Sequence, residues 1–242
     1  MCAWEVKRFW KEAGVNEVEG GFAVHLDGRA VKTPAKAPLV VPTRAMAEAI
    51  AAEWDAQEGK VDPASMPVTR AANSSIDKVR TQLSEVAALI AAYGETDLLC
   101  YRAEAPEALI ALQAEGWDAL LDWAHATHGA RLAVTQGILP VAQPAEAIAA
   151  LAAQVAALDE WELAALHDLV GITGSLVLGL AVVQGRLGAA EAWDLSRIDE
   201  EWQIAQWGDD EEAREQALLK KEALLAAERF WALRHPAATD AN

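Results

Sequence analysis

Two histidines three residues apart form the pair whose spacing in this sequence best fits metal coordination. His125 and His128 lie in HATH, and on a helix residues at i and i+3 can reach one metal ion. They also extend an apolar stripe through Trp117 and Leu121, in the last turn before Gly129, where the helix dipole favours histidine. No cysteine or third histidine lies nearby in the sequence. The pair is therefore either a metal site or a structural pair.

A dense run of carboxylates surrounds two tryptophans near the end of the sequence. Paired carboxylates beside aromatic side chains are typical of glycoside hydrolases. Helix capping is another explanation, because Asp209 followed by Glu212 fits a capping box. Trp202 and Trp207 are five residues apart, so one can pack inward while the other stays available to a partner. Catalysis, a solvated helix face and an acidic recognition surface remain open for IDEEWQIAQWGDDEEAREQ, which holds Asp199, Glu200, Glu201, Asp209, Asp210, Glu211, Glu212 and Glu215.

Other common signatures of enzymes and membrane proteins are missing from the sequence. There is no Walker A motif and no GxGxxG, and GITGS does not match GxSxG, so Ser175 is not in a nucleophile elbow. The uncharged run from Leu169 to Val183 has fifteen residues, and a membrane span needs about 20. This run favours a buried helix of a bundle. We therefore expect no cofactor and no membrane insertion.

The charge of the chain is strongly negative and unevenly distributed. The 242 residues carry a net charge of −17. Residues 1–85 hold 11 Lys and Arg against 12 Asp and Glu, whereas residues 86–242 hold 9 against 25. Such a field repels nucleic acids and anionic lipids, and it suits either plain solubility or a basic protein partner.

The cysteine content and the first residues indicate a reducing compartment. The only cysteines are Cys2 and Cys100, which form no CxxC pair and no disulfide framework. MCAWEVKRFWKEAG has no continuous apolar run, so it is not a secretory signal, and it is too short and too acidic for a transit peptide. A bacterial cytoplasm is the location we expect.

The elements that would position these residues begin with a β-hairpin. Asp27 and Gly28 separate the alternating run FAVHL from RAVKT, and a type I′ turn needs positive φ at both of its central residues. In that register Val24 faces Val31. Leu39 to Val41 is a further short strand. We expect the charges of this hairpin, on Arg29, Lys32 and Lys36, to face outward.

The chain then becomes helical. Thr43 is the expected N-cap of a helix that ends at Gly59, and Met46, Ile50 and Trp54 form one row along it. We expect Trp54 to anchor this helix to the sheet. Apolar periodicity predicts further helices over residues 76–93, 106–129, 144–158, 160–184 and 209–233. It also predicts a helix that follows residue 184 and ends near residue 207. The fold class is therefore α+β, with an N-terminal α+β domain over 1–85 and a larger all-α domain over 86–242.

Several phrases, taken together and in order, resemble one protein family. LDGRAVKTPAKAPLVVP, AAEWDAQ, MPVTRAANSSIDKV, TDLLCYRAE, GSLVLGLAV and DEEWQIAQWGDDEEA follow one another here as they do in assembly chaperones of the F-type ATP synthase. The chain is similar to the members that bind the alpha subunit of the catalytic sector, in mitochondria and related bacteria. The resemblance spans residues 7 to 230, and no phrase in it is a catalytic signature.

The resemblance implies two domains, no enzymatic activity and no cofactor. It implies a chaperone that holds the free alpha subunit, prevents its aggregation and hands it to the beta subunit. For partner contact we select the acidic C-terminal region, namely Glu200, Glu201, Trp207, Asp210 and Glu212. We assign structural roles to Trp54, Asp27 and Gly28. The alternatives are a small-molecule enzyme using His125 and His128 or the acidic cluster, and a generic holdase.

Overall fold

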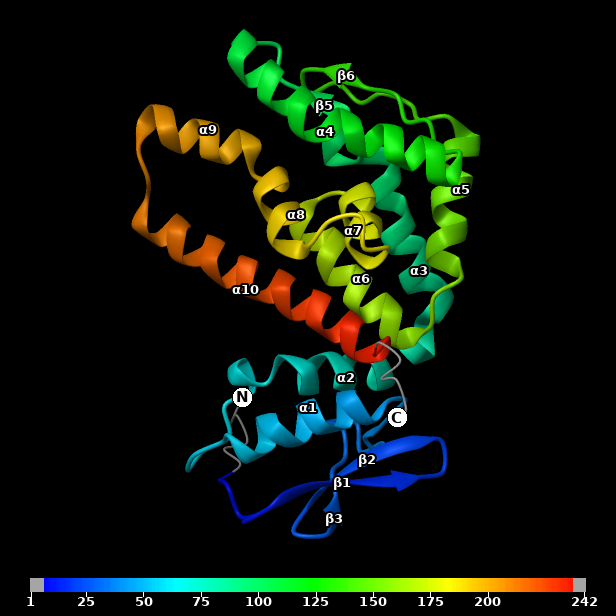
Figure 1. Cartoon of the computed structure of the whole chain (residues 1–242), viewed down its shortest axis with the longest axis vertical. Coiled ribbons are helices and arrows are strands. Elements are labelled where there is room, and N and C mark those ends of the chain that lie inside the picture. Colours follow the sequence, from blue (N-terminus) through cyan, green and yellow to red (C-terminus); the bar gives the residue numbers. More distant parts are fainter. Residues whose placement is uncertain (1–6, 237–242) are drawn as a thin grey trace, which may run out of the picture. The chain divides into compact units, whose positions relative to one another are not determined.

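The structure is a computed structural model that describes residues 7–236. It has the expected α+β class, with a small N-terminal β-sheet region followed by a larger helical region (Figure 1). The chain forms two compact units. Unit 1 contains the residues up to Gln82, with Glu160–Ala164 and the chain from Arg229 onward; unit 2 contains Leu83–Asp159 and Ala165–Glu228. The expected domain limits at residues 85 and 86 remain a prediction.

Unit 1 is built around an antiparallel sheet. Strand β1 (Ala13–Val18) pairs with β2 (Gly21–Leu26), which also pairs with β3 (Arg29–Ala30) and β4 (Val40–Val41). Asp27 and Gly28 have φ of +46° and +77°, as a type I′ turn requires. The Val31 amide donates to the Val24 carbonyl at 2.9 Å, so the predicted hairpin and its register are confirmed.

Asp27 also fastens the hairpin to the chain before it. Its carboxylate accepts hydrogen bonds from the amides of Lys11 and Glu12, both at 3.0 Å. These backbone donors, from Glu12 first and then Lys11, lower the pKa of Asp27 below its usual value. The residue therefore serves both the turn and the position of the N-terminal segment.

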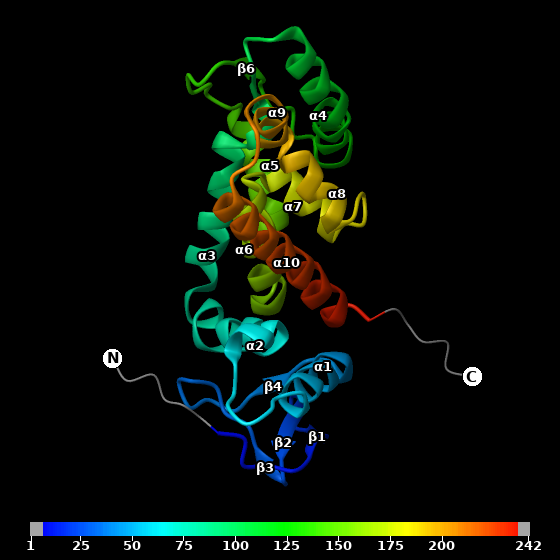
Figure 2. The same cartoon turned by 90° about the vertical axis from the view of Figure 1, so that its left-hand side faces the viewer.

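Helix α1 (Arg44–Asp55) covers one face of the sheet. The Thr43 hydroxyl accepts from the Met46 amide at 3.2 Å, which confirms the expected N-cap. Met46 and Ile50 are fully buried, and Trp54 is half-buried in the same row. Figure 2 shows α1 between the sheet and α2 (Pro67–Asp77). The helix ends four residues before Gly59, where we expected it to end.

The end of the chain is tied to the start of α1 within unit 1. The Thr43 hydroxyl donates to the carbonyl of Leu233 at 2.7 Å. His235 Nε2 lies 2.8 Å from the carboxylate of Glu162. Residues from three separate parts of the sequence thus belong to this unit.

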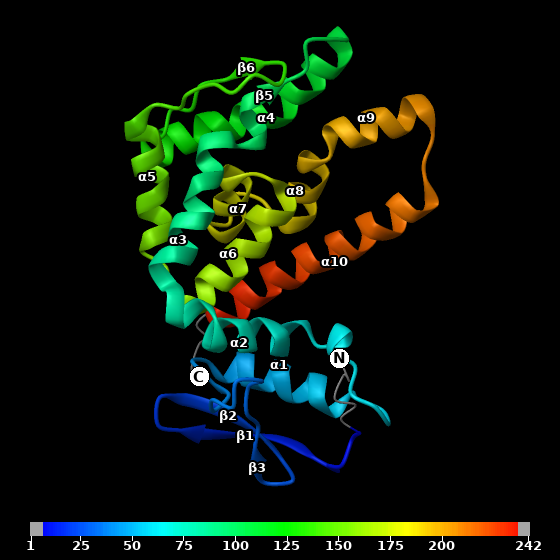
Figure 3. The ribbon, with the colours of Figure 1, turned by 180° about the vertical axis from the view of Figure 1, so that it is seen from behind.

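Unit 2 consists mainly of helices. A two-stranded parallel sheet of β5 (Tyr101–Arg102) and β6 (Thr135–Gln136) is its only β-structure among the described residues. Helices α3 and α5 lie side by side (Figures 1 and 3). The helices that lie wholly or partly in unit 2 are α3 (Leu83–Ala91), α4 (Glu107–His128), α5 (Ala145–Ala156), α6 (Glu160–Thr173), α7 (Leu176–Val183), α8 (Ala189–Ser196), α9 (Ile198–Trp207) and α10 (Glu211–Arg234).

Two long helices expected from periodicity are interrupted. The expected helix over 76–93 is divided at Lys78, whose φ of −122° and ψ of −63° leave the helical region, and a 3₁₀ turn, Val79–Gln82, follows before α3. The expected helix over 160–184 is divided at Gly174, with φ of +71°, and at Ser175, which is extended. Apolar residues continue through both interruptions, so the hydrophobic pattern alone cannot reveal them.

The apolar run of unit 2 forms the core of this unit. Every residue from Leu176 to Val182 in α7 is buried. Within residues 7–236, no helix is both long enough and apolar enough to cross a membrane. The run therefore belongs to the helical core of unit 2, as its length indicated, but it comprises the end of α6 and all of α7 rather than one helix.

Candidate partner-binding surface

Polar residues of the phrases that resemble the chaperone family hold the fold together. Asp97, in TDLLCYRAE, is the clearest case. Its buried carboxylate accepts from the Ser175 hydroxyl at 2.7 Å, the Val177 amide at 3.0 Å and the Leu99 amide at 3.0 Å. It therefore joins TDLL to the start of α7, and it explains why the chain breaks its helix at Ser175. Burial is the main influence on Asp97 and raises its pKa to about 6, although the hydrogen bonds act in the opposite direction.

Two carboxylates in unit 1 also hold segments of the fold together by accepting hydrogen bonds. Glu53, in AAEWDAQ, accepts from the amides of Val68 and Thr69 at 2.8 Å each and so caps the start of α2. Asp77, in SSIDKV, accepts from the Thr33 hydroxyl at 2.6 Å and the Ala35 amide at 3.0 Å. The loop after the hairpin is therefore held by α2, and its composition reflects folding rather than ligand binding.

Helix α9 is fixed at its first turn by α4. Gln113 donates to Asp199 at 2.6 Å, and the Trp117 indole donates to the Leu195 carbonyl at 2.9 Å. A Cβ at Gly116 would lie 2.9 Å from the terminal side-chain carbons of Leu195 and Ile198, so a larger residue here would require these side chains to shift. Asp199 is thus a structural member of the acidic run.

The residues selected for partner contact all lie beyond that anchor and are exposed. They belong to α9, to α10 and to the connection between these helices, which Figures 1 and 3 show. Glu201 pairs with Arg197 at 3.2 Å, and Asp210 accepts from the Ala213 amide at 2.9 Å as the cap of α10. The expected cap, Asp209, instead contacts Arg214 at 3.2 Å. That expectation was wrong because α10 begins one residue later than the capping-box pattern places it.

Three of the five residues selected for partner contact form no ion pair or helix cap among the described residues. The side chains of Glu200, Trp207 and Glu212 form no hydrogen bond or ion pair with any residue between 7 and 236. Trp207 is 80% exposed, whereas Trp202 is half-buried, so the two tryptophans divide as their spacing indicated. Leu218 and Leu219 of α10 are also more than half exposed. Residues 198–219, the α9–α10 segment, therefore expose apolar side chains among carboxylates, without a bound partner.

The sequence did not reveal all of these features. The roles of Asp97, Gln113 and Asp77 depend on partners far along the chain, so no local pattern identifies them. Leu218 and Leu219 lie in a helical apolar pattern that normally indicates core, and only the structure shows that they face solvent.

The histidine pair shows no metal site. His128 packs edge-to-face on Trp123, and burial lowers its pKa, while Gln184 acts in the opposite direction. Among the described residues, no three His, Cys, Asp and Glu side chains are arranged to hold a metal ion. His125 instead lines a shallow pocket on α4, which is described further below.

Comparison with known proteins places the chain in a family. A family model described as ATP12 chaperone protein matches residues 7–125. The crystal structure of Atp12 from Paracoccus denitrificans is 52% identical, covers 96% of this chain and 100% of that one, and has a TM-score of 0.93. The structure of Atu1473 from Agrobacterium tumefaciens is 45% identical, covers 92% and 85% of the two chains, and has a TM-score of 0.87.

A curated eukaryotic relative agrees with these structures. Protein atp12, mitochondrial, from Schizosaccharomyces pombe is 27% identical over 221 residues, which cover 86% of this chain and 76% of that protein. The chain therefore belongs to the Atp12 chaperone family. The resemblance to ATP synthase assembly chaperones, drawn from the motifs, is confirmed at the level of the family.

Proposed function

We propose that this protein is an assembly chaperone that binds the free alpha subunit of the F-type ATP synthase catalytic sector. It prevents aggregation of that subunit and transfers it to the beta subunit. Membership of the Atp12 chaperone family supports the general role, and the alpha subunit as partner follows from the motif resemblance. The chaperone acts in the bacterial cytoplasm, the counterpart of the mitochondrial matrix.

The observation that carries the proposal is the unpartnered surface of the α9–α10 segment. Trp207 is 80% exposed, and large aromatic side chains at the centre of an interface contribute much of its binding energy. Residues 199–215 hold eight Asp and Glu against one Arg, so a basic rim on the partner would be complementary. Glu200, Glu201, Trp207, Asp210 and Glu212 remain the proposed contact residues.

Release of the alpha subunit depends on competition with the beta subunit rather than on ATP hydrolysis by the chaperone. The sequence has no Walker A motif to couple release to ATP hydrolysis. A free alpha subunit exposes the apolar surface that the beta subunit later covers, and exposed apolar surface promotes aggregation. The beta subunit therefore displaces the chaperone by mass action through its larger interface.

An aggregation assay tests this role. Purified alpha subunit is diluted from denaturant, and light scattering is followed with and without the chaperone. We expect suppression at a one-to-one ratio for the alpha subunit, and little suppression for an unrelated protein of similar size. Equal protection of both proteins would instead identify a generic holdase.

Trp207→Ala is expected to weaken binding of the alpha subunit about 30-fold, or ~2 kcal/mol. The reason is the loss of a large exposed side chain that no internal contact requires. Affinity is measured by surface plasmon resonance on immobilised alpha subunit. Leu89→Ala, at a 56% exposed leucine of α3, is the matched control and should leave affinity unchanged. Equal affinity of Trp207→Ala and wild type would remove this surface from the proposal.

A further inference from the structure

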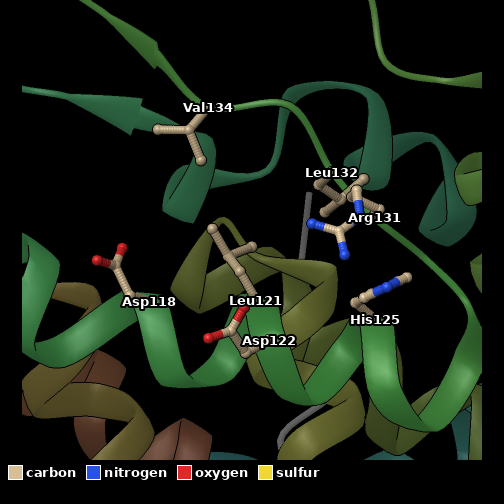
Figure 4. Close-up of a pocket in the computed structure, with 7 residues that line it drawn as sticks. All are labelled: Asp118, Leu121, Asp122, His125, Arg131, Leu132 and Val134. Carbon is tan, nitrogen blue, oxygen red and sulfur yellow. The ribbon is translucent and has the colours of Figure 1, made fainter.

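A second exposed surface lies on the C-terminal half of α4, directly after the residues that anchor α9. Helix α4 and residues 131–134 enclose an open pocket of about 240 Å³. Figure 4 shows Asp118 and Asp122 toward one end of it, and His125 and Arg131 toward the other. Leu121 lies next to Asp122, and Val134 lies above them on the opposite wall of the pocket. The pocket therefore combines a carboxylate pair with apolar side chains.

The carboxylate pair retains capacity for a cation. Asp118 and Asp122 are one helical turn apart and face the same pocket. Asp118 pairs with Arg102 at 2.8 Å, but its side chain is 60% exposed and can accept further hydrogen bonds. Asp122 is exposed and forms no ion pair with any residue between 7 and 236. A lysine or arginine placed here would meet two carboxylates.

The chain that forms the other wall continues into exposed apolar residues. Val134 is 49% exposed, Ile138 is 94% exposed and Leu139 is 76% exposed. Ile138 lies four residues beyond Val134, after a bend at Gly137, whose φ is +75°. We call the pocket residues and these exposed side chains together the α4–β6 strip, defined by Asp118, Leu121, Asp122, Val134, Ile138 and Leu139.

The backbone from Ala133 to Gly137, which carries Val134 and leads directly to Ile138, is held in place by hydrogen bonds. Gln143 bonds to both backbone groups of Ala133, accepting from its amide at 2.7 Å and donating to its carbonyl at 3.0 Å. Strand β6 pairs with β5, and the Gly137 amide donates to the Arg102 carbonyl at 2.9 Å. Large apolar side chains on a fixed backbone lose little entropy when a partner covers them. This arrangement is typical of a binding surface.

We propose that the α4–β6 strip binds an extended apolar segment of the client polypeptide that carries one lysine or arginine. The cation lies between Asp118 and Asp122, its alkyl stem contacts Leu121 and Val134, and the following apolar residues contact Ile138 and Leu139. This inference rests on the proposed function for the identity of the client. Charge complementarity selects a basic segment, because an acidic one would meet two carboxylates.

The test uses two fluorescein-labelled peptides of alternating Val and Thr, one with a central Lys and one with a central Glu. Binding to the full-length protein is measured by fluorescence anisotropy. We expect the Lys peptide to bind at least about tenfold more tightly than the Glu peptide. Asp122→Lys, and the double variant Ile138→Asp with Leu139→Asp, should each weaken the Lys peptide about tenfold.

Matched controls change the same kinds of residue elsewhere in unit 2. Glu146→Lys reverses an exposed charge on α5, and Leu89→Asp replaces an exposed leucine on α3; both should bind the Lys peptide like wild type. Equal binding of the two peptides, no binding of the Lys peptide, or binding unaffected by Asp122→Lys would overturn the inference.

Retention of alpha subunit by the same variants separates this inference from the proposed function. If wild type retains the alpha subunit and the strip variants retain it equally well, the inference is wrong and the proposed function stands. If wild type does not retain the alpha subunit, the proposed function fails, while the peptide result still decides whether the strip binds a basic apolar segment.

Discussion

Asp97→Ala is expected to lower the free energy of unfolding by about 3–5 kcal/mol at pH 4, where this carboxyl group contributes its full stability. The carboxylate accepts from Leu99, Ser175 and Val177, and Asp97 is completely buried. Alanine leaves these three donors without an acceptor and leaves a cavity between TDLL and α7. Each unmet buried donor costs about 1–3 kcal/mol, and part of that cost is recovered by relaxation. Urea denaturation followed by circular dichroism measures the loss.

The control for this variant is Asp122→Ala. That aspartate is exposed on α4, so its replacement should change stability by no more than about 0.5 kcal/mol. If Asp97→Ala were as stable as Asp122→Ala, the hydrogen bonds to Asp97 would not be what holds the start of α7.

The carboxyl group of Asp97 makes the free energy of unfolding depend on pH. Its pKa is about 6 in the folded protein, against 3.8 as the ordinary value, so the folded state holds the proton more tightly than the unfolded state. The stability that this group contributes is therefore fully present below pH 4 and is lost as the pH rises through 6. The loss is about 3 kcal/mol for this group alone.

A comparison of wild type with Asp97→Asn separates the pH dependence that comes from Asp97 from that of the other carboxyl groups. Asparagine does not titrate, so the stability of wild type minus that of the variant should fall between pH 4 and pH 7. The measurement is urea denaturation of both proteins across this range. A difference that rises with pH would show that Asp97 is ionised more easily in the folded protein than in the unfolded chain.

Trp54→Arg is expected to destabilise unit 1 by about 3–5 kcal/mol, which is a large part of the ordinary stability of a folded domain. Trp54 packs edge-to-face on Trp10, with ring centroids 5.2 Å apart, and Trp10 is 3% exposed. Arg8 lies over the other side of this cluster, 5.5 Å from the Trp10 ring, and pairs with Asp55 at 3.0 Å. A second guanidinium would replace aromatic packing and repel Arg8.

Hydrogen exchange locates this effect. Amide protection of β2 should fall in Trp54→Arg, and Trp54→Phe should keep most of it because the ring contact with Trp10 remains. A cooperative thermal transition and β2 protection equal to those of wild type would show that Trp54 is not an anchor of helix and sheet.

Local features of the fold were predictable from the sequence. The Asp27-Gly28 turn, the Thr43 cap and the limits of α4 each depend on neighbouring residues, and the structure has all three. The interruption at Ser175 was not predictable, because it serves Asp97, 78 positions away in the sequence. Periodicity describes one helix at a time, whereas this break belongs to a contact between two segments.

The candidate site shows the same limit. Spacing indicated that one of Trp202 and Trp207 would be free, but only the structure shows which. Asp199 belongs to the acidic run by sequence, yet Gln113 engages it as part of the anchor of α9. Removing such structurally engaged residues from the run leaves Glu200, Trp207, Glu212 and Glu215 as exposed side chains with no hydrogen bond or ion pair among the described residues.

The central claim is that this protein is a dedicated chaperone of the alpha subunit. The most direct measurement is co-purification of the tagged protein with alpha subunit alone and with beta subunit alone, each expressed from the same source. The account predicts a one-to-one complex with the alpha subunit only, which dissociates when the beta subunit is added. A folded protein that retains neither subunit, or that retains both equally, would contradict it.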